Sequence, residues 1–94
     1  MFDIRFDGPD RIFISGRFDA AQEEVAEAFL NAVEHSAVVD FSELSYIASN
    51  GLGLLFATHK RLLDAGEALK LVNLNPHLQE VFKLTGFDTI FEIE

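Results

Sequence analysis

The sequence contains no cysteine, no tryptophan and only two prolines. Without cysteine there is no disulfide framework, thiol nucleophile or cysteine-ligated zinc site, a composition that fits a reducing compartment. Basic residues are also scarce, because seven Lys and Arg stand against sixteen Asp and Glu, for a net charge of −9. Nucleic acids and anionic lipid surfaces are both bound through concentrated Lys and Arg. We therefore expect neither nucleic acid nor a membrane as a direct partner.

Long apolar runs and targeting signals are missing as well. The longest stretch without Asp, Glu, Lys or Arg, residues 44–59, has 16 residues interrupted by Ser, Asn and Gly. A membrane helix needs roughly 18 or more apolar residues. Residues 1–5 alternate charged and apolar side chains and lack the basic-then-apolar layout of a signal peptide. The expected location is the cytoplasm.

What the sequence does contain is enough apolar material for one core. Leu, Ile, Val and Phe make up 34 of the 94 residues, well above the roughly 20% below which chains tend to stay disordered. The length corresponds to a single domain spanning residues 1–94.

Residue spacing predicts an alternation of strands and helices. Period-two alternation marks the first strand, and the Asp7–Asp10 turn makes it a hairpin with the second. Apolar residues at helical spacing, bounded by capping residues, mark the helices. The expected strands are 2–6, 11–15, 37–41, 68–74 and a short strand or packed tail at 89–93, and the expected helices are 19–35, 49–66 and 76–86.

Two apolar stripes are expected to face the core. On the first helix the stripe consists of Val25, Phe29, Ala32 and Val33. On the second helix it consists of Leu52, Leu55, Phe56, Leu62 and Leu63, with His59 on the same side.

The element order β-β-α-β-α-β-α predicts an α/β fold. Right-handed crossovers give a mostly parallel sheet of four to five strands with about three helices, and the hairpin adds one antiparallel strand. In such sheets, sites lie beyond the carboxyl ends of the parallel strands. Three segments should converge there: 16–19, 40–52 and 74–76. We expect Asp40 at the carboxyl end of its strand.

The segment Ile47–Gly53 is the most informative. Asn-Gly between apolar residues is a hairpin signal, but the helical spacing that follows favours a helix start with Ser49 or Asn50 as its cap. A bare cap needs no function. A helix N-terminus is also a site for an anion or a phosphorylated hydroxyl.

Enzymatic interpretations are weaker. Ser49, His59 and Asp40 supply the residue types of a hydrolytic triad, yet Ile47 stands where a nucleophile elbow needs glycine. The pair Gly51 and Gly53 is half of a nucleotide-binding fingerprint, and packing of the helix on the sheet explains both glycines. His35, His59 and His77 are too dispersed for a metal motif. We expect no enzyme activity, no metal and no cofactor.

The segment Asp40-Phe41-Ser42-Glu43-Leu44-Ser45-Tyr46-Ile47-Ala48-Ser49-Asn50-Gly51-Leu52-Gly53-Leu54-Leu55 resembles the signature of the STAS family, the anti-sigma factor antagonists. Residues 15–20 are similar to the family's Gly-x-Leu-Asp turn, and residues 71–93 are similar to its C-terminal half. The resemblance implies the STAS fold and a binding module that captures an anti-sigma factor, typically a serine kinase of the histidine-kinase-like ATPase class. Phosphorylation of the second Ser in the family's turn ends that capture.

The departures from the family pattern concern its switch. Ala48 stands where the family has Asp, Asn50 where it has the phosphorylated Ser, and Arg17 where an acidic residue is common. Two hypotheses follow: binding without control by phosphorylation, or Ser49 as a substitute phosphoacceptor. The resemblance and the helix start together predict a partner-binding surface made of Asp19, Tyr46, Ile47, Ser49, Asn50, Gly51 and Leu54.

Two further expectations concern partners. The alternative function is that of a STAS subunit of a phospholipid ABC transporter, which would dock on the transporter's ATPase. Many family members continue into another helix after the position of Ile93. We therefore expect uncovered apolar surface near the C-terminus, which would favour a homodimer or a partner.

Overall fold

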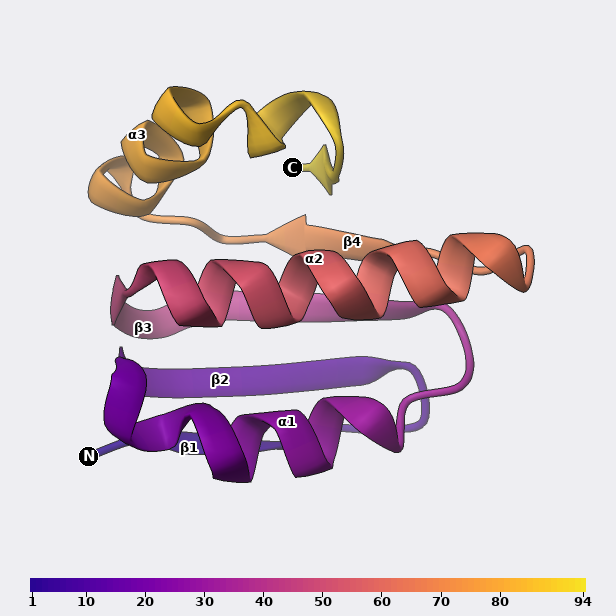
Figure 1. Cartoon of the computed structure of the whole chain (residues 1–94). Coiled ribbons are helices and arrows are strands. Elements are labelled where there is room, and N and C mark those ends of the chain that lie inside the picture. Colours follow the sequence, from indigo (N-terminus) through magenta and orange to yellow (C-terminus); the bar gives the residue numbers. More distant parts are fainter.

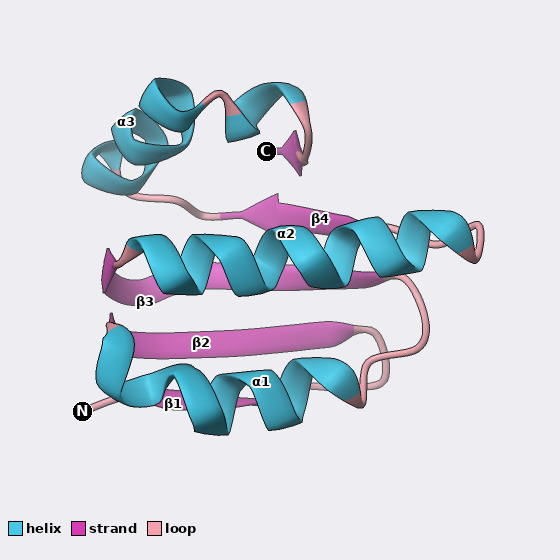
Figure 2. Cartoon of the chain, in the orientation of Figure 1, coloured by secondary structure: helices cyan, strands magenta, loops and turns pink.

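A five-stranded mixed sheet organises the chain (Figures 1 and 2). The computed structural model describes all 94 residues. The strands are β1 (Asp3–Phe6), β2 (Arg11–Phe18), β3 (Ala37–Ile47), β4 (Leu69–Val72) and β5 (Glu92–Ile93). The helices are α1 (Glu23–Asn31), α2 (Ser49–Asp64) and α3 (Pro76–Thr85), with single 3₁₀ turns η1 (Ala20–Gln22) and η2 (Phe87–Thr89).

The strands follow one another across the sheet in chain order, β1-β2-β3-β4-β5. The β1–β2 pair is antiparallel and the other three pairs are parallel. This confirms the predicted α/β class, the hairpin and the mostly parallel sheet. Helices α1 and α2 lie side by side on one face, and both begin at the same end of the sheet (Figure 1). Helix α3 lies beyond β4.

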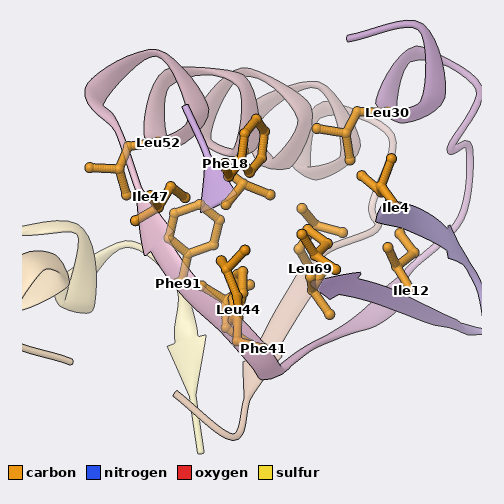
Figure 3. Packing of buried hydrophobic residues seen from close by; sticks show 14 of the residues in the cluster. Ile4, Ile12, Phe18, Leu30, Phe41, Leu44, Ile47, Leu52, Leu69 and Phe91 are labelled. Carbon is orange, nitrogen blue, oxygen red and sulfur yellow. The ribbon is translucent and has the colours of Figure 1, made fainter. Parts of the chain in front are cut away.

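The core lies between that face of the sheet and the helices (Figure 3). Ile12, Ile14 and Phe18 alternate along β2 and are fully buried. From α3, Phe82 contacts the rings of Phe41 and Phe91, with centroids 6.2 and 6.0 Å apart. Burying such a large aromatic side chain stabilises the fold by about 2 to 3 kcal/mol.

The predicted stripes are partly wrong. Helix α1 buries Ala26 and Leu30, whereas Val25 is 59% exposed. Phe29 is half-buried against the core and Val33 is buried, as predicted. Residues 20–22 form a 3₁₀ turn, so the α-helix begins later than expected. Ala32 is exposed and only caps the end of α1. On α2, Leu62 is buried but Leu63 is 52% exposed, because consecutive helical residues point about 100° apart.

Strand β3 is longer than predicted and continues to Ile47, so Asp40 lies within the strand and not at its carboxyl end. The β4 pairing does stop at Asp40, opposite Val72. Beyond that point β3 pairs with β2 alone, with a bulge after Asp40 that shifts the register from Phe13↔Asp40 to Ser15↔Glu43. The extra length carries β3 directly to the start of α2.

Helix boundaries follow the predicted chemistry at both ends of α3 and at the end of α2. Asn75 caps α3 by accepting from the backbone N–H of Leu78 at 2.8 Å. Gly86 ends α3 with a φ of 79°, and Gly66 follows α2 with a φ of 78°. This left-handed conformation suits glycine. Asp19 caps η1, not α1. None of the helices is long and apolar enough to cross a membrane.

Exposed large apolar side chains are spread along the chain and include two near the C-terminus. Leu84 is 77% exposed and Ile90 40% exposed. Ile90 and Leu63 line a shallow cavity of about 710 Å³ at the amino-terminal ends of β3 and β4. This cavity lies at the opposite end of the sheet from the start of α2.

Candidate functional site

The carboxyl end of β3 leads directly into the N-terminus of α2, beside the carboxyl end of β2. Phe18 and Ile47 are register partners in the parallel pair, and both are buried. One residue further, the backbone N–H of Ala48 donates to the carbonyl oxygen of Phe18 at 2.8 Å. The helix therefore starts immediately at the sheet edge, without a connecting loop.

Gly51 allows the first turn of α2 to lie close to the sheet. A Cβ added at Gly51 would lie 3.0 Å from Ile47 Cγ1 and 3.1 Å from the Phe18 ring. Helix–sheet packing thus accounts for Gly51, as predicted. It does not account for Gly53, which is exposed and whose added Cβ would meet nothing within 4 Å.

The prediction that Ser49 or Asn50 caps α2 is wrong. The capping position is held by Ala48, with extended backbone angles of φ −89° and ψ 169°, and no side chain caps the helix. The carbonyl oxygen of Ala48 accepts the first intrahelical bond, from Leu52. Ser49 and Asn50 are therefore the first two residues of the helix, where backbone N–H groups have no intrahelical acceptor.

Asn50 connects the starts of the two neighbouring helices. Its side-chain amide donates to Glu23 Oε1 at 3.0 Å, and Glu23 is the first residue of α1. Asn50 is half-buried and Ser49 beside it is exposed. The sequence alone does not indicate this contact, because only the parallel crossovers bring positions 23 and 50 together.

The surface beside the N-terminus of α2 is formed by the end of β2 and the neighbouring part of β3. We call the side chains of Arg17, Asp19 and Tyr46 there the rim. The Arg17 guanidinium lies 4.2 Å from the centroid of the Tyr46 ring and its Nε lies 4.0 Å from Asp19 Oδ2. Ser45 Oγ donates to the Gly16 carbonyl at 2.9 Å. Gly16 has a φ of 85°, and an added Cβ would lie 1.8 Å from the Met1 carbonyl oxygen. A larger residue at position 16 would therefore displace the backbone of Met1 and Phe2.

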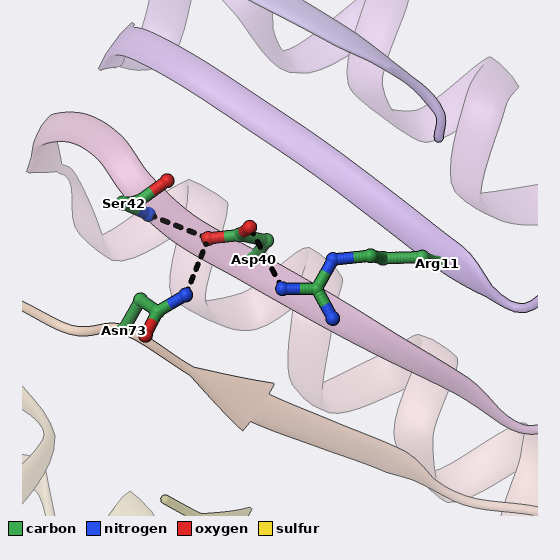
Figure 4. Close-up of polar contacts among 4 residues, drawn as sticks. All are labelled: Arg11, Asp40, Ser42 and Asn73. Atoms are coloured by element: carbon green, nitrogen blue, oxygen red, sulfur yellow. Dashed lines mark hydrogen bonds and ion pairs between the residues drawn. The ribbon is translucent and has the colours of Figure 1, made fainter. Parts of the chain in front are cut away.

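Asp40 lies in a separate polar cluster on the face of the sheet away from α1 and α2 (Figure 4). Its carboxylate accepts from Arg11 at 2.9 Å, from the Ser42 backbone N–H at 2.9 Å and from Asn73 Nδ2 at 3.1 Å. Burial alone would raise the pKa of Asp40, but these hydrogen bonds outweigh it and lower the pKa to about 2. The cluster fixes the bulge after Asp40. Asn73 has a φ of 62°. Asn is one of the few non-glycine residue types that adopt this left-handed conformation, so its residue type is a sequence signal for a turn after β4.

The residue types of a hydrolytic triad are not brought together. His59 is buried and occupied on both nitrogens: Nδ1 accepts from the Leu69 backbone N–H at 3.1 Å, and Nε2 lies 3.2 Å from the Ile90 carbonyl oxygen. Only an Nε2–H tautomer satisfies both contacts. His59 also lies ten residues along α2 from Ser49, about 15 Å at 1.5 Å per residue. Its contacts join α2 to β4 and to the C-terminal segment.

The third converging segment, residues 74–76, meets β3 before its end. Asn75 Nδ2 donates to the carbonyl oxygen of Leu44 at 3.3 Å while its side-chain oxygen caps α3. It therefore positions α3 against the strand that leads to α2.

The structure divides the predicted surface residues into two groups. Asp19, Tyr46, Ser49, Asn50 and Leu54 are exposed or half-buried around the start of α2. Ile47, 4% exposed, and Gly51, also buried, lie beneath this group and support it. Their expected place in the accessible surface is corrected accordingly.

Comparison with known proteins gives consistent relatives. The family model described as Mlab, STAS domain, matches residues 4–92. BtrV of Bordetella bronchiseptica, named as a candidate anti-sigma factor antagonist, is 34% identical over 93 residues, covering 95% of this chain and 80% of BtrV. The anti-sigma-B factor antagonist of Listeria monocytogenes is 34% identical over 87 residues, covering 88% of this chain and 76% of that protein.

Solved structures show the same fold. An anti-sigma factor antagonist from Mycobacterium paratuberculosis superposes with a TM-score of 0.82 at 26% identity, covering 99% of this chain and 83% of the other. SpoIIAA in its unphosphorylated form gives a TM-score of 0.78 at 22% identity, covering 100% and 88%. The five-stranded sheet, the helix that starts directly at its edge and these relatives lead to one conclusion: the chain belongs to the STAS domain family, which includes the anti-sigma factor antagonists.

Proposed function

We propose that this protein is an anti-sigma factor antagonist that binds its partner through the N-terminus of α2. The observation that carries the proposal is the accessible helix start, with Ser49 exposed and Asn50 half-buried, held at the sheet edge by Phe18 and Ile47. The names of the relatives in Bordetella and Listeria support the same role. The protein would act by binding alone, without catalysis and without a cofactor.

The proposed contact surface is small and mixed in character. It consists of Asp19, Tyr46, Ser49, Asn50 and Leu54. The Arg17 guanidinium lies over the Tyr46 ring. Leu54, one helical turn after Asn50, packs partly against the core and leaves part of its apolar side chain accessible. An aromatic and an aliphatic group beside unsatisfied backbone donors are suited to a protein partner.

We propose as partner an anti-sigma factor that is a serine kinase of the histidine-kinase-like ATPase class. An Asn at position 50 has no hydroxyl to phosphorylate, so capture would be independent of phosphorylation at this position. Ser49 is the competing acceptor because its hydroxyl is exposed at the first position of α2. Incubation with the captured kinase and ATP, followed by mass spectrometry, separates the two hypotheses. Stoichiometric phosphate on Ser49 would contradict phosphorylation-independent capture.

Affinity capture from the native cell tests the function itself. The wild-type protein is expected to retain an anti-sigma kinase, and Asn50→Asp is expected to weaken its binding at least tenfold, measured by calorimetry, because a charge is then buried in the interface. Asn31→Asp is the matched control, since it adds the same charge at the far end of α1. Equal binding by Asn50→Asp and wild type would contradict this surface. Retention of a transporter ATPase in place of a kinase would favour the transporter-subunit alternative.

A further inference from the structure

The hydrogen bond between Asn50 and Glu23 bears on how this surface responds to charge. Asn50 Nδ2 donates to Glu23 Oε1 at 3.0 Å, and the two residues hold the second position of α2 and the first position of α1. Because both helices begin at the same end of the sheet (Figure 1), Glu23 lies where two helix N-termini meet. The surface therefore already contains one carboxylate beside position 50.

Helix N-termini favour a negative group because their unpaired N–H groups carry partial positive charge. Glu23 supplies that charge within its own helix and, through Asn50, next to α2. A neutral amide at position 50 complements Glu23 by donating a hydrogen bond. A carboxylate or phosphoryl group there would remove the donor and bring two like charges close together.

Glu23 forms no ion pair. The ion pairs involve Arg5, Arg11, Arg17 and Lys70, and none of them includes Glu23. Arg17, which belongs to the same rim, is engaged with Tyr46 and Asp19. A second acidic residue, Glu24, follows Glu23 in the first turn of α1. The local charge is therefore negative before any modification.

We propose that Glu23 is a specificity-determining residue of this surface, which accepts a neutral hydrogen-bond donor at position 50 and excludes an anionic group there. The proposal deepens the proposed function and rests on it for its biological meaning: capture of the partner would be insulated from phosphorylation at this position by the neighbouring helix as well as by the missing hydroxyl. Replacing Asn50 by Ser would supply a hydroxyl, but a phosphoryl group on it would still lie beside the Glu23 carboxylate and destabilise the protein.

A double-mutant cycle on the isolated protein tests this. Asn50→Asp in the wild-type background is expected to lower the melting temperature by about 2–5 °C, the range for a partly exposed charge contact in a domain of this size. In the Glu23→Gln background the same substitution should leave the melting temperature unchanged or raise it by about 2 °C, because the new carboxylate then favours the helix dipole and accepts from the Gln amide. The sign of the effect depends on residue 23.

Two controls show whether the contact or the general charge is responsible. Glu24→Gln removes the same charge one residue away, and in that background Asn50→Asp should remain as destabilising as in wild type. In 1 M NaCl the loss in the wild-type background should shrink, because partly exposed charges are screened. An equal effect of Asn50→Asp in the wild-type and Glu23→Gln backgrounds would overturn the proposal, as would rescue by Glu24→Gln to the same extent.

The outcome is separable from that of the proposed function. The cycle needs no partner, so failure to capture an anti-sigma kinase leaves the measured coupling between residues 23 and 50 intact. Conversely, if residues 23 and 50 show no coupling, Glu23 has no such role. The proposed function is still tested separately, by whether the wild-type protein captures the kinase and whether Asn50→Asp weakens that capture.

Discussion

The Arg11 guanidinium and the Asp40 carboxylate form an ion pair of 2.9 Å between β2 and β3. The Asp40 side chain is 13% exposed, whereas that of Arg11 is 40% exposed. The same carboxylate accepts from the Ser42 backbone N–H and thereby closes the bulge in β3 (Figure 4). The ion pair therefore helps to set the register between β2 and β3, the strand that continues to Tyr46 and Ile47.

Stability should depend on the ionisation of Asp40. Its pKa is lowered from 3.8 to about 2 in the folded protein, so the stabilisation is complete above about pH 4 and is lost as the pH falls from 4 to 2. Its size is at most about 2.4 kcal/mol, at 1.36 kcal/mol per pKa unit. Asp40→Asn should be less stable at pH 7 by about 1–2 kcal/mol and should depend less on pH between 4 and 2 in urea unfolding. The same pH dependence in Asp40→Asn and wild type would contradict this role.

Gly51 and Gly53 form a matched pair within one helical turn. Gly51→Ala should destabilise the protein by about 1–3 kcal/mol, because the added methyl group meets Ile47 and Phe18 at 3.0–3.1 Å in a closely packed region. Gly53→Ala should stabilise it by about 0.5–1 kcal/mol, because nothing lies within 4 Å and alanine favours the helix. Thermal unfolding measures both. Opposite signs are the expected result, and a destabilising Gly53→Ala would contradict the geometry.

The Gly53 variant also reports on the proposed surface. A stabilised protein that captures its partner more weakly would show that the partner approaches the helix backbone closely at this position. Unchanged capture would place the interface nearer to Tyr46 and Asn50. Both results are interpretable because the stability of the variant is measured independently.

The sequence predicts those features that depend on neighbouring residues. The Asn75–Pro76 helix start and the Gly86 helix end are set by local backbone chemistry, and both are confirmed. The order and direction of the strands followed from the crossover rule. Two of the four residues predicted on the inward face of α1 were wrong, Val25 and Ala32, because the helix buries Ala26 and Leu30 beside the correctly predicted Phe29 and Val33.

Contacts between distant segments were not predictable in this way. The Asn50–Glu23 bond joins residues 27 positions apart, and the Asp40–Asn73 bond joins residues 33 positions apart. Each depends on the position of an entire crossover. The residue types of Ile47–Gly53 predicted a helix start, but Ala48 holds the capping position because the chain remains extended up to it.

The two helices on the sheet face are also joined at their other ends. Arg61 of α2 donates to the carbonyl oxygen of Leu30 in the last turn of α1 at 3.0 Å. Arg61→Met should cost about 0.5–1.5 kcal/mol, because the hydrogen bond and the favourable charge at a helix C-terminus are both lost. Amide hydrogen exchange should accelerate at the end of α1. Lys60→Met, at the adjacent exposed position, is the control and should leave that exchange unchanged.

Asn75 performs two tasks that substitution can separate. Its side-chain oxygen accepts from the Leu78 N–H at 2.8 Å and caps α3, while its amide nitrogen donates to the Leu44 carbonyl at 3.3 Å. Asn75→Asp keeps the cap and removes only the donor. Asn75→Ala removes both contacts and should lower the free energy of unfolding by about 1 kcal/mol or more, so the Asp variant should be the more stable of the two. Urea unfolding of the two variants gives the difference. An Asp variant as unstable as the Ala variant would show that the contact with β3, and not the cap, holds α3 in place.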